Sequence, residues 1–573
     1  MTLQSKRWQI AQRVSKQQLT LFPDLAPLVV QLLHNRNLDD PGPVRDFLAG
    51  RVAVDNPFQL KGMNEAVTRL RQAIEKGEAI AVYGDFDADG VTATALVVQT
   101  LSALDAQVVP YIPDRVKEGY GLNLTALRKL YSQGIRVVVT VDCGIRSICE
   151  VREAGKGLAM IITDHHTPLD ELPPALAVIN PKQPDCPYPH ENLAGVGLAF
   201  KLAQGLLRAQ SKAGRGSDLD EDSLLDLVAL GTVADLAPLQ DENRSLVRRG
   251  LELLNEARRP GVEALMADAG LRRGKVDANA IGFRLGPRLN AAGRMDTAML
   301  AYRLLTSKEP LEARELAGKL SKLNRDRQAA TEEIVAAAEK QVQASDPDAY
   351  LLMASGEDFQ PGIVGLAASR LTEEYYRPSA VVELGKEKSR GSCRSIPEFN
   401  ITRALDRCTD ILERHGGHPI AAGFTIKTQN LDALRQRLQA IAAEELAEME
   451  LRPTLKIDAE IHLEEVSWAT HALLGQIEPC GIKNPQPILL SPGLEVRDRR
   501  AIGKEGKHLK LTLSDGRGVA WDAIYFRAGH LLGQMPGRVD AVYTLEANEW
   551  NHRKRLQLNI RDLREVSPGE RRT

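Results

Sequence analysis

The chain has 573 residues, 43% of them hydrophobic and 26% charged, and a formal net charge of -2. One hydrophobic core rarely supports that length, so three or four domains are expected. The near-neutral charge argues against a uniformly basic nucleic-acid binder, and any such binding must use local clusters of Lys and Arg. No signal peptide, no run of about 18 apolar residues and no CxxC pair is found, which predicts a cytoplasmic protein with reduced cysteines.

Residues 79–178 alternate short β-branched runs with longer segments of helical periodicity. This alternation is typical of successive βαβ units and a parallel sheet. The expected strands are 79–83, 107–112, 136–141 and 159–163, and the expected helices are 91–104, 122–132 and 146–154.

Three acidic segments begin where an expected strand ends. They start at Asp85, at Asp142 and at Asp164, the last continuing into His165 and His166. Ligands of open α/β sheets gather beyond the carboxyl ends of the strands, so the three segments would share one rim. Asp235 follows an apolar run at 223–230 that is expected to be helical, from which it could reach the same rim.

The first acidic segment, Gly84 to Gly90, opens like a calcium-binding EF-hand loop. That reading fails because Leu96 stands where the loop needs a bidentate Glu and because a strand precedes the motif. A solvated acidic turn is the alternative for this segment alone. With several acidic groups at one rim, each carboxylate would raise the pKa of the others unless cations neutralised them.

Carboxylates and histidines without cysteine favour Mn²⁺ or Mg²⁺ over a zinc site with thiolates. Two such ions about 3.5 to 4 Å apart, bridged by one carboxylate, would activate water and stabilise the leaving oxygen in a phosphoryl displacement. Asp142, expected at the end of a central strand, is the candidate for the bridge. The pattern therefore predicts a hydrolase that acts on phosphates.

Further along, residues 211–218 are rich in Gly, Ser and charge and predict an exposed loop. Residues 310–345 have the periodicity of one long helix, expected to bridge two domains. A second α/β pattern at 350–449 contains expected strands at 350–354 and 379–383. After Pro453, short β runs at 509–513, 519–524 and 538–544 predict a small closed β-barrel.

Asp164-His165-His166, together with Asp87, Asp89, Asp142 and Asp235, resembles the motifs of the DHH phosphoesterase superfamily. Residues 392–400 and 415–423 look like the DHH-associated domain, and residues 286–294 are similar to a segment typical of the RecJ exonucleases. The resemblance runs from about Lys61 to Leu563. One departure is Phe359-Gln360, where the family usually has Trp-His, and this leaves any role of that His open.

The resemblance implies an α/β fold with a parallel-sheet DHH domain and its helical part at 61–305, after an N-terminal extension at 1–60. A connecting helix at 306–346 would lead to a second α/β domain, the DHH-associated domain, at 347–450. An OB-like β-barrel that binds DNA would occupy 451–573.

The implied activity is 5′ to 3′ exonucleolytic hydrolysis of single-stranded DNA to 5′-mononucleotides with two Mn²⁺ or Mg²⁺ ions. The residues carried over by motif are Asp87, Asp89, Asp142, His165 and Asp235 as metal ligands; His166, Asp85 and His418 as catalytic residues; and Arg394, Ser392, Arg115, Arg288 and Asn290 as contacts to the 5′ phosphate or DNA. Whether Asp85 touches a metal is left open. For any single Arg, a surface salt bridge is the alternative explanation.

An OB-fold binds single strands by stacking bases on aromatic side chains within a positive groove. The barrel region offers Arg497, Arg499, Arg500, Lys504, Lys507, Lys510, Arg553, Lys554 and Arg555 as charges, and Trp521, Tyr525, Phe526 and Trp550 as aromatics. The alternative is that half of these aromatics belong to the barrel core, for which Trp521 is the best candidate.

Two other functions compete with the exonuclease. A DHH phosphodiesterase of short oligonucleotides or cyclic dinucleotides would not need the residues after Arg452, which favour a polymer. A non-catalytic replication scaffold would have lost metal ligands, whereas every expected carboxylate and histidine is present. Family analogy implies a monomer without membrane association that works in recombination and repair beside a single-strand-binding protein and a RecQ-type helicase.

Overall fold

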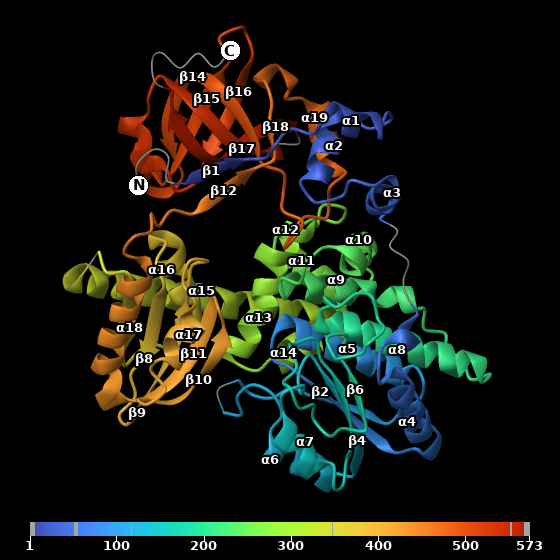
Figure 1. Ribbon diagram of the computed structural model, residues 1–573. Helices are drawn as coiled ribbons and strands as arrows, with labels where there is room; N and C mark the ends of the chain where they lie inside the picture. Colours follow the sequence, from blue (N-terminus) through green and yellow to red (C-terminus); the bar gives the residue numbers. More distant parts are fainter. Residues whose placement is uncertain (1–5, 51–55, 116, 347, 551–552, 567–573) are drawn as a thin grey trace. The chain divides into compact units, whose positions relative to one another are not determined.

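The computed structural model describes residues 6–50, 56–115, 117–346, 348–550 and 553–566 (Figure 1). These residues form two compact units. One lies within residues 53–451, and the other combines residues of 1–52 with residues of 452–573. Among the described residues, no helix is both long enough and apolar enough to cross a lipid bilayer.

The first unit contains a five-stranded parallel sheet in the order β3-β2-β4-β5-β6. The strands are β2 (Ala79–Gly84), β3 (Val108–Tyr111), β4 (Ile135–Val141), β5 (Ala159–Thr163) and β6 (Ala177–Ile179). The four predicted strands are confirmed, and β6 extends the sheet by one more. Strand β4 lies at the centre, and its valines are buried because helices cover both faces.

Residues of β2 alternate between the two faces of this sheet. Ile80 and Val82 join the core formed with α4 (Met63–Lys76), α5 (Ala88–Ser102) and α8 (Gly195–Lys212). Ala81 and Tyr83 join the core formed with α6 (Leu124–Ser132) and α7 (Ile148–Ala154). The predicted loop at 211–218 begins two residues late, since α8 continues to Lys212.

A helical region follows α8 and packs on the same core. It consists of α9 (Leu225–Ala234), α10 (Asp241–Glu256), α11 (Pro260–Asp268), α12 (Ala278–Ala280), the π-helical turn η3 (Ile281–Leu285), α13 (Gly286–Met295) and α14 (Met299–Thr306). Helix α9 packs against α5, and α13 packs against α9, which brings the far end of this region back to the loop after β2.

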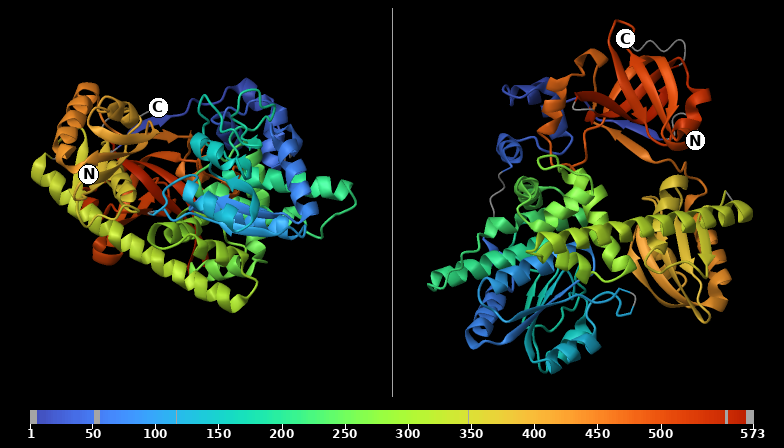
Figure 2. Two further views of the ribbon diagram at one scale, coloured as in Figure 1. Left: turned by 90° about the horizontal axis from the view of Figure 1, so that it is seen from below. Right: turned by 180° about the vertical axis from the view of Figure 1, so that it is seen from behind.

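The predicted long helix is confirmed as α15 (Pro310–Ser345), drawn as one continuous rod in Figure 2. Its first half contributes Leu316 and Leu320 to the core of the parallel sheet. Its second half contributes Ile334 and Ala338 to a core shared with the next domain. One helix therefore connects the two cores of this unit.

The second domain is a five-stranded mixed sheet in the order β10-β11-β9-β8-β7, in which only β7 and β8 are parallel. The strands are β7 (Leu352–Gly356), β8 (Ser379–Glu383), β9 (Lys388–Arg394), β10 (Leu412–His418) and β11 (Ala421–Lys427), and the helices are α16 (Val364–Tyr375), α17 (Ile401–Asp406) and α18 (Leu431–Leu446). Helix α16 packs against β9, which positions its first turn beside Ser392 and Arg394.

The other unit is built around the predicted barrel. The strands β14 (Leu489–Ile502), β15 (His508–Ser514), β16 (Ala520–Tyr525), β18 (Arg553–Glu565) and β17 (Arg538–Trp550) follow one another around it. Pairing of β17 with β14 closes the barrel. Two short strands, β12 (Thr454–Ile457) and β13 (Ala459–Glu460), and helix α19 (Trp468–Gly475) precede it.

The N-terminal segment, predicted only as an extension, belongs to this barrel unit. Its strand β1 (Arg7–Ile10) pairs in parallel with β12. Helices α1 (Lys16–Thr20), α2 (Pro27–His34) and α3 (Pro41–Ala49) follow, and Leu32 and Leu33 of α2 are buried in the barrel core. The indole N–H of Trp8 donates to Asp562 of β18 at 2.8 Å.

Removing the Leu32 side chain tests this assignment. Leu32 is fully buried in the barrel core, so Leu32→Ala should lower the free energy of unfolding of this unit by about 2 to 5 kcal/mol. Leu21→Ala is the matched control, because half of Leu21 is exposed. Chemical denaturation followed by tryptophan fluorescence measures both, and equal small effects would show that the helix adds nothing to the barrel.

Candidate metal and phosphate site

The acidic loop after β2 is held in a tight turn. Asp87 caps α5, and its Oδ1 accepts hydrogen bonds from the backbone N–H groups of Asp89, at 2.9 Å, and Gly90, at 3.0 Å. Gly90 packs so close to Asp85 that a Cβ would lie 2.5 Å from the Asp85 carbonyl oxygen. The Oδ1 of Asn290 accepts from the N–H of Ala88 at 2.8 Å, which ties α13 to the turn.

Asp89 is completely buried, and both of its oxygens are oriented by the start of α8. They accept hydrogen bonds from the backbone N–H groups of Gly195, at 2.7 Å, and Val196, at 2.8 Å. The positive end of a helix dipole stabilises such a carboxylate. Burial and the charge of Asp87 nevertheless raise the pKa of Asp89 to about 7.

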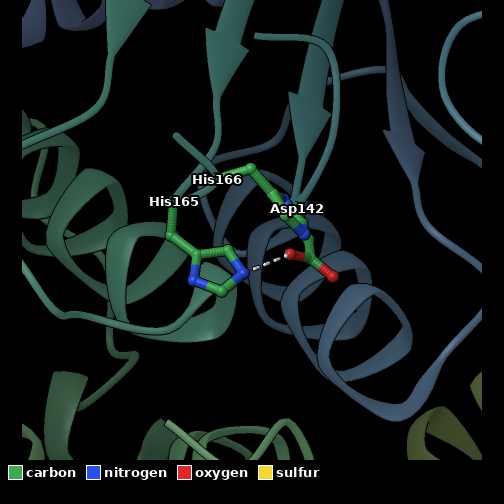
Figure 3. Close-up of side chains that lie close together, drawn as sticks. All are labelled: Asp142, His165 and His166. Carbon is green, nitrogen blue, oxygen red and sulfur yellow. Dashed lines mark ion pairs between the residues drawn. The ribbon is translucent and has the colours of Figure 1, made fainter. Parts of the chain in front are cut away.

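Asp142 follows the central strand β4 in a left-handed backbone conformation, with φ at +62°. This conformation is uncommon for residues other than Gly, and strained positions of this kind cluster at functional sites. Its Oδ1 lies 3.1 Å from the Nε2 of His165 (Figure 3). Neither atom has a hydrogen-bond partner among the described residues.

His165 is electrically neutral in this setting. Burial, with the nearby His166 charge, lowers its pKa to about 3, so its ring can offer a lone pair. Its Nε2 also lies 3.7 Å from Oδ2 of Asp235, the residue that follows α9, and 4.0 Å from Oδ2 of Asp89. Burial and the charge of Asp89 raise the pKa of Asp235 to about 9.

His166 pairs with Asp164. Its Nδ1 lies 2.8 Å from Oδ1 of Asp164, whose Oδ2 accepts from the N–H of Ile145 at 2.9 Å. Burial opposes charge on both groups, but the hydrogen bonds raise the pKa of His166 and lower the pKa of Asp164. The carbonyls of His165 and His166 accept from Lys182 and Asn180, at 2.5 and 2.8 Å, which fixes the backbone of the pair.

These side chains form three overlapping groups whose ligand atoms all lie within 4.8 Å of one another. The groups are Asp85, Asp87 and Asp142; Asp142, His165 and His166; and Asp89, His165 and Asp235. Asp85 Oδ1, Asp142 Oδ1 and His165 Nε2 are buried atoms without hydrogen-bond partners among the described residues. Oxygen and imidazole donors without a thiolate suit Mn²⁺ or Mg²⁺, so the residues fit the ions that the sequence predicted.

A second feature of the unit is a small anion-binding arrangement on β9. The guanidinium of Arg394 donates to the hydroxyl of Ser392 at 3.2 Å and to the carbonyl of Cys393 at 2.7 Å. A Cβ on Gly365, in the first turn of α16, would lie 3.0 Å from the Ser392 Oγ and 3.2 Å from Arg394 Nη2. A helix N-terminus beside an Arg and a hydroxyl suits a phosphate.

Arg294 links this arrangement to the acidic loop. It lies at the end of α13 and donates to the carbonyl of Gly362 at 2.9 Å. Burial, then the nearby charges of Arg115 and Arg327, lowers its pKa to about 9. Arg115 packs 3.8 Å over the ring of Phe86, and its buried Nε has no partner among the described residues.

The structure does not bring every predicted residue to the carboxylates. Arg288 donates to the hydroxyl of Ser321, at 2.9 Å, and to the carbonyl of Arg284, so its guanidinium is held between α13 and α15. His418 is exposed at the end of β10, and no contact of its side chain with the carboxylates is present among the described residues.

Several site residues were missed by sequence reasoning. Arg294 ends a recognised motif yet was not singled out. Gly195 could not be found from local patterns, because its role is to let α8 approach Asp142 and Asp89. Tyr120, whose hydroxyl lies 3.3 Å from the Nδ1 of His166, has no distinguishing signal in the sequence.

Comparisons with known proteins agree with this division of the chain. Family models match at residues 79–232 (DHH family, N-terminal domain), 348–444 (DHHA1 domain) and 457–562 (RecJ OB domain). The chain is 41% identical over 565 residues to the single-stranded-DNA-specific exonuclease RecJ of Bacillus subtilis, covering 97% of this chain and 70% of that protein. It is 34% identical to RecJ of Escherichia coli, covering 97% and 99%.

A solved structure is also similar. The crystal structure of RecJ in complex with Mn²⁺ from Thermus thermophilus superposes with a TM-score of 0.84 at 30% identity, covering 98% of this chain and 80% of that one. A parallel sheet with a DHH motif at its rim, followed by a DHHA1 domain, defines a DHH phosphoesterase. Within that superfamily, the chain belongs to the RecJ family.

Adding one methyl group at Gly195 tests how tightly the rim is built. A Cβ there would lie 2.7 Å from both Cβ and Oδ1 of Asp142, so Gly195→Ala should displace that carboxylate and weaken Mn²⁺ binding by about 10- to 100-fold. Gly197→Ala is the matched control, with its nearest atom at 3.5 Å. Calorimetric titration with Mn²⁺ measures the affinity of each variant. Equal affinities in the two variants would contradict the close approach of Gly195 to Asp142.

The raised pKa values of Asp89 and Asp235, about 7 and 9, predict how the metal-free protein responds to pH. The pKa of Asp in the unfolded chain is about 4. Between this value and the raised pKa values, the folded state therefore binds more protons than the unfolded state and loses stability as pH rises. We expect the Tm of EDTA-treated protein to fall from pH 5 to 9. Asp235→Asn should reduce the decrease of Tm at the alkaline end of this range. Asp170→Asn is the control, because this residue is exposed, and it should leave the decrease of Tm unchanged. A Tm independent of pH would contradict the account.

Proposed function

We propose that this protein hydrolyses single-stranded DNA from the 5′ end and releases 5′-mononucleotides. As a member of the RecJ family it is a metal-dependent, single-strand-specific exonuclease. The observation that carries the proposal is the continuity of the site. Asp142 and His165 are shared between the three ligand groups, and Arg115 and Arg294 connect the acidic loop to Ser392 and Arg394.

Five residues are proposed to hold two ions: Asp87, Asp89, Asp142, His165 and Asp235, with Asp142 as the bridge. When bound, the ions supply an activated water and the charge that stabilises the leaving oxygen. The N–H groups of Gly195 and Val196 hold Asp89 in place, and the turn capped by Asp87 presents its carboxylates to the same rim.

His166 contributes positive charge beside the phosphate. Its Nδ1 proton is held by Asp164, which leaves Nε2–H as a donor toward a phosphate oxygen. Burial opposes this charge, but the hydrogen bond to Asp164 and the charge of Asp164 raise the pKa of His166 and so favour it. Asp85, with one buried unpaired oxygen next to Arg115, is proposed to orient that Arg or a nearby proton donor. The side chain of His418 is exposed, and the side chains of Arg288 and Asn290 contact Ser321 and the N–H of Ala88.

The direction of digestion follows from the anion-binding arrangement. Ser392, Arg394 and the first turn of α16 suit a terminal phosphate, which carries more charge than a phosphodiester inside a strand. An end held there would set how far the strand enters the rim. Binding of the terminal phosphate would then explain both the recognition of the 5′ end and the release of mononucleotides.

The barrel is proposed to grip the strand through Phe526. This ring is 51% exposed and lies edge-on to His508, with 5.2 Å between ring centroids. Trp521 and Tyr525 instead pack against the barrel core. The side chains of Trp550 and Arg553 lie outside the described residues. A small-substrate phosphodiesterase would not need this exposed aromatic, and a non-catalytic scaffold would not need the full ligand set.

We further propose, from family analogy, a cytoplasmic monomer that works beside a single-strand-binding protein and a RecQ-type helicase in recombination and repair.

Digestion of end-labelled DNA tests the proposed function. With Mn²⁺, a 5′-labelled single strand should release labelled mononucleotide at once, whereas a 3′-labelled strand should release its label last. Blunt duplex DNA should resist digestion. Asp142→Asn should abolish release of both the 5′ label and the 3′ label from the single strand. Early release of the 3′ label would overturn the proposed polarity, and rapid cleavage of blunt duplex would overturn the strand specificity.

Arg394 can be tested separately from catalysis. Arg394→Ala should reduce the preference for 5′-phosphate over 5′-hydroxyl ends by about tenfold, because one charge-assisted contact is lost. Arg390→Ala is the matched control, an exposed Arg four residues earlier on the same strand. The readout is the ratio of kcat/KM for the two ends, and an unchanged ratio in Arg394→Ala would remove this residue from end recognition.

A further inference from the structure

Phe283 is the most exposed large hydrophobic residue among those that the structure describes, with 79% of its surface accessible. Its neighbours Ile281 and Leu285 are completely buried in the core. The turn therefore anchors itself without Phe283. An aromatic ring left in water beside two buried apolar residues needs another explanation.

The backbone around Phe283 is unusual. Residues 281–285 form the π-helical turn η3 between α12 and α13, and π-helical turns are rare and frequent at functional sites. A Cβ on Gly282, the residue before Phe283, would have no atom within 4 Å, so this part of the turn is not packed against other segments. The turn thus presents an exposed ring.

The surrounding sequence is strongly basic. Four basic residues near the turn are exposed, Arg272, Arg273, Lys275 and Arg284, and of these Arg273 pairs with Glu263. Arg284, next to Phe283, is exposed and donates to the carbonyl of Ala269, which brings the loop after α11 to the same place. Exposed aromatics among clustered cations are the pattern by which proteins hold single-stranded nucleic acid.

The turn also lies close to the catalytic rim. Gly286, three residues after Phe283, packs against Ala234, and the next residue is Asp235. Asn290 binds the N–H of Ala88 in the acidic loop. Seven residues separate Phe283 from Asn290, or about 10 Å at the rise of a helix. A strand with a phosphate at the rim could therefore reach the ring.

We propose that Phe283 stacks on a base of the single strand while the nearby basic residues hold its phosphates. This inference rests on the proposed function and adds a contact to it. Stacking on Phe283 requires a base with a free face. A base inside a duplex has none, so the same contact contributes to the selection of single strands.

The test is a scan with abasic oligonucleotides, read as binding affinity without divalent metal. A series of 5′-phosphorylated single strands, each lacking one base, is titrated by fluorescence anisotropy in EDTA. Wild-type protein should bind one member, or two adjacent ones, about fivefold or more weakly than the intact strand. Phe283→Ala should bind the intact strand about fivefold or more weakly than wild type and lose that dependence on position, whereas Phe283→Trp should retain both.

Leu311→Ala is the matched control, since Leu311 of α15 is 74% exposed and should behave as wild type. If Phe283→Ala keeps the wild-type affinity and abasic profile, the inference is wrong although the proposed function stands. That outcome would indicate that Phe283 contacts a protein partner instead of DNA. If wild-type protein binds every member of the series like the intact strand, the inference is wrong, and if it also digests no single strand with Mn²⁺, the proposed function fails as well.

Discussion

Mutual repulsion among buried carboxylates is the constraint on which the rest of the site depends. Asp85, Asp89, Asp142 and Asp235 share one rim, and burial with neighbouring charges raises the pKa of each. Burying so many acids costs free energy unless cations neutralise them. The fold stabilises this arrangement before metal arrives, and bound ions then remove a repulsion that is already built in. The relief of this repulsion therefore contributes to the affinity of the folded protein for metal ions.

Hydrogen bonds from backbone N–H groups and the packing of backbone segments hold this arrangement. Adjacent parallel strands end at the same edge, which aligns Asp85, Asp142 and Asp164. The first N–H groups of α8 fix Asp89, and the amide of Asn290 fixes the loop from the opposite direction. Rigid elements of this kind keep ligands within the small tolerance that catalysis needs. The anion-binding arrangement on β9 also depends on close backbone packing, since Gly365 allows α16 to approach Arg394.

Much of this architecture could be predicted from the sequence, because it depends on short-range patterns. Apolar runs that end in acids located the strands and the rim, and uninterrupted helical periodicity located α15 with its observed ends. What the sequence could not provide depends on contacts between distant segments. Pairing of β1 with β12, the approach of Gly195 to Asp142 and the engagement of Arg288 with Ser321 join residues far apart in the chain. Phe283 was missed because an exposed Phe looks like a core residue in a sequence.

The central claim is that Asp142 and His165 belong to one site for two ions. Anomalous diffraction at the manganese edge from crystals grown with Mn²⁺ measures this directly. The account predicts two peaks at the rim of the parallel sheet, with the Asp142 carboxylate within ligand distance of both and His165 within ligand distance of at least one. A single peak, or two peaks with Asp142 bound to neither, would contradict it.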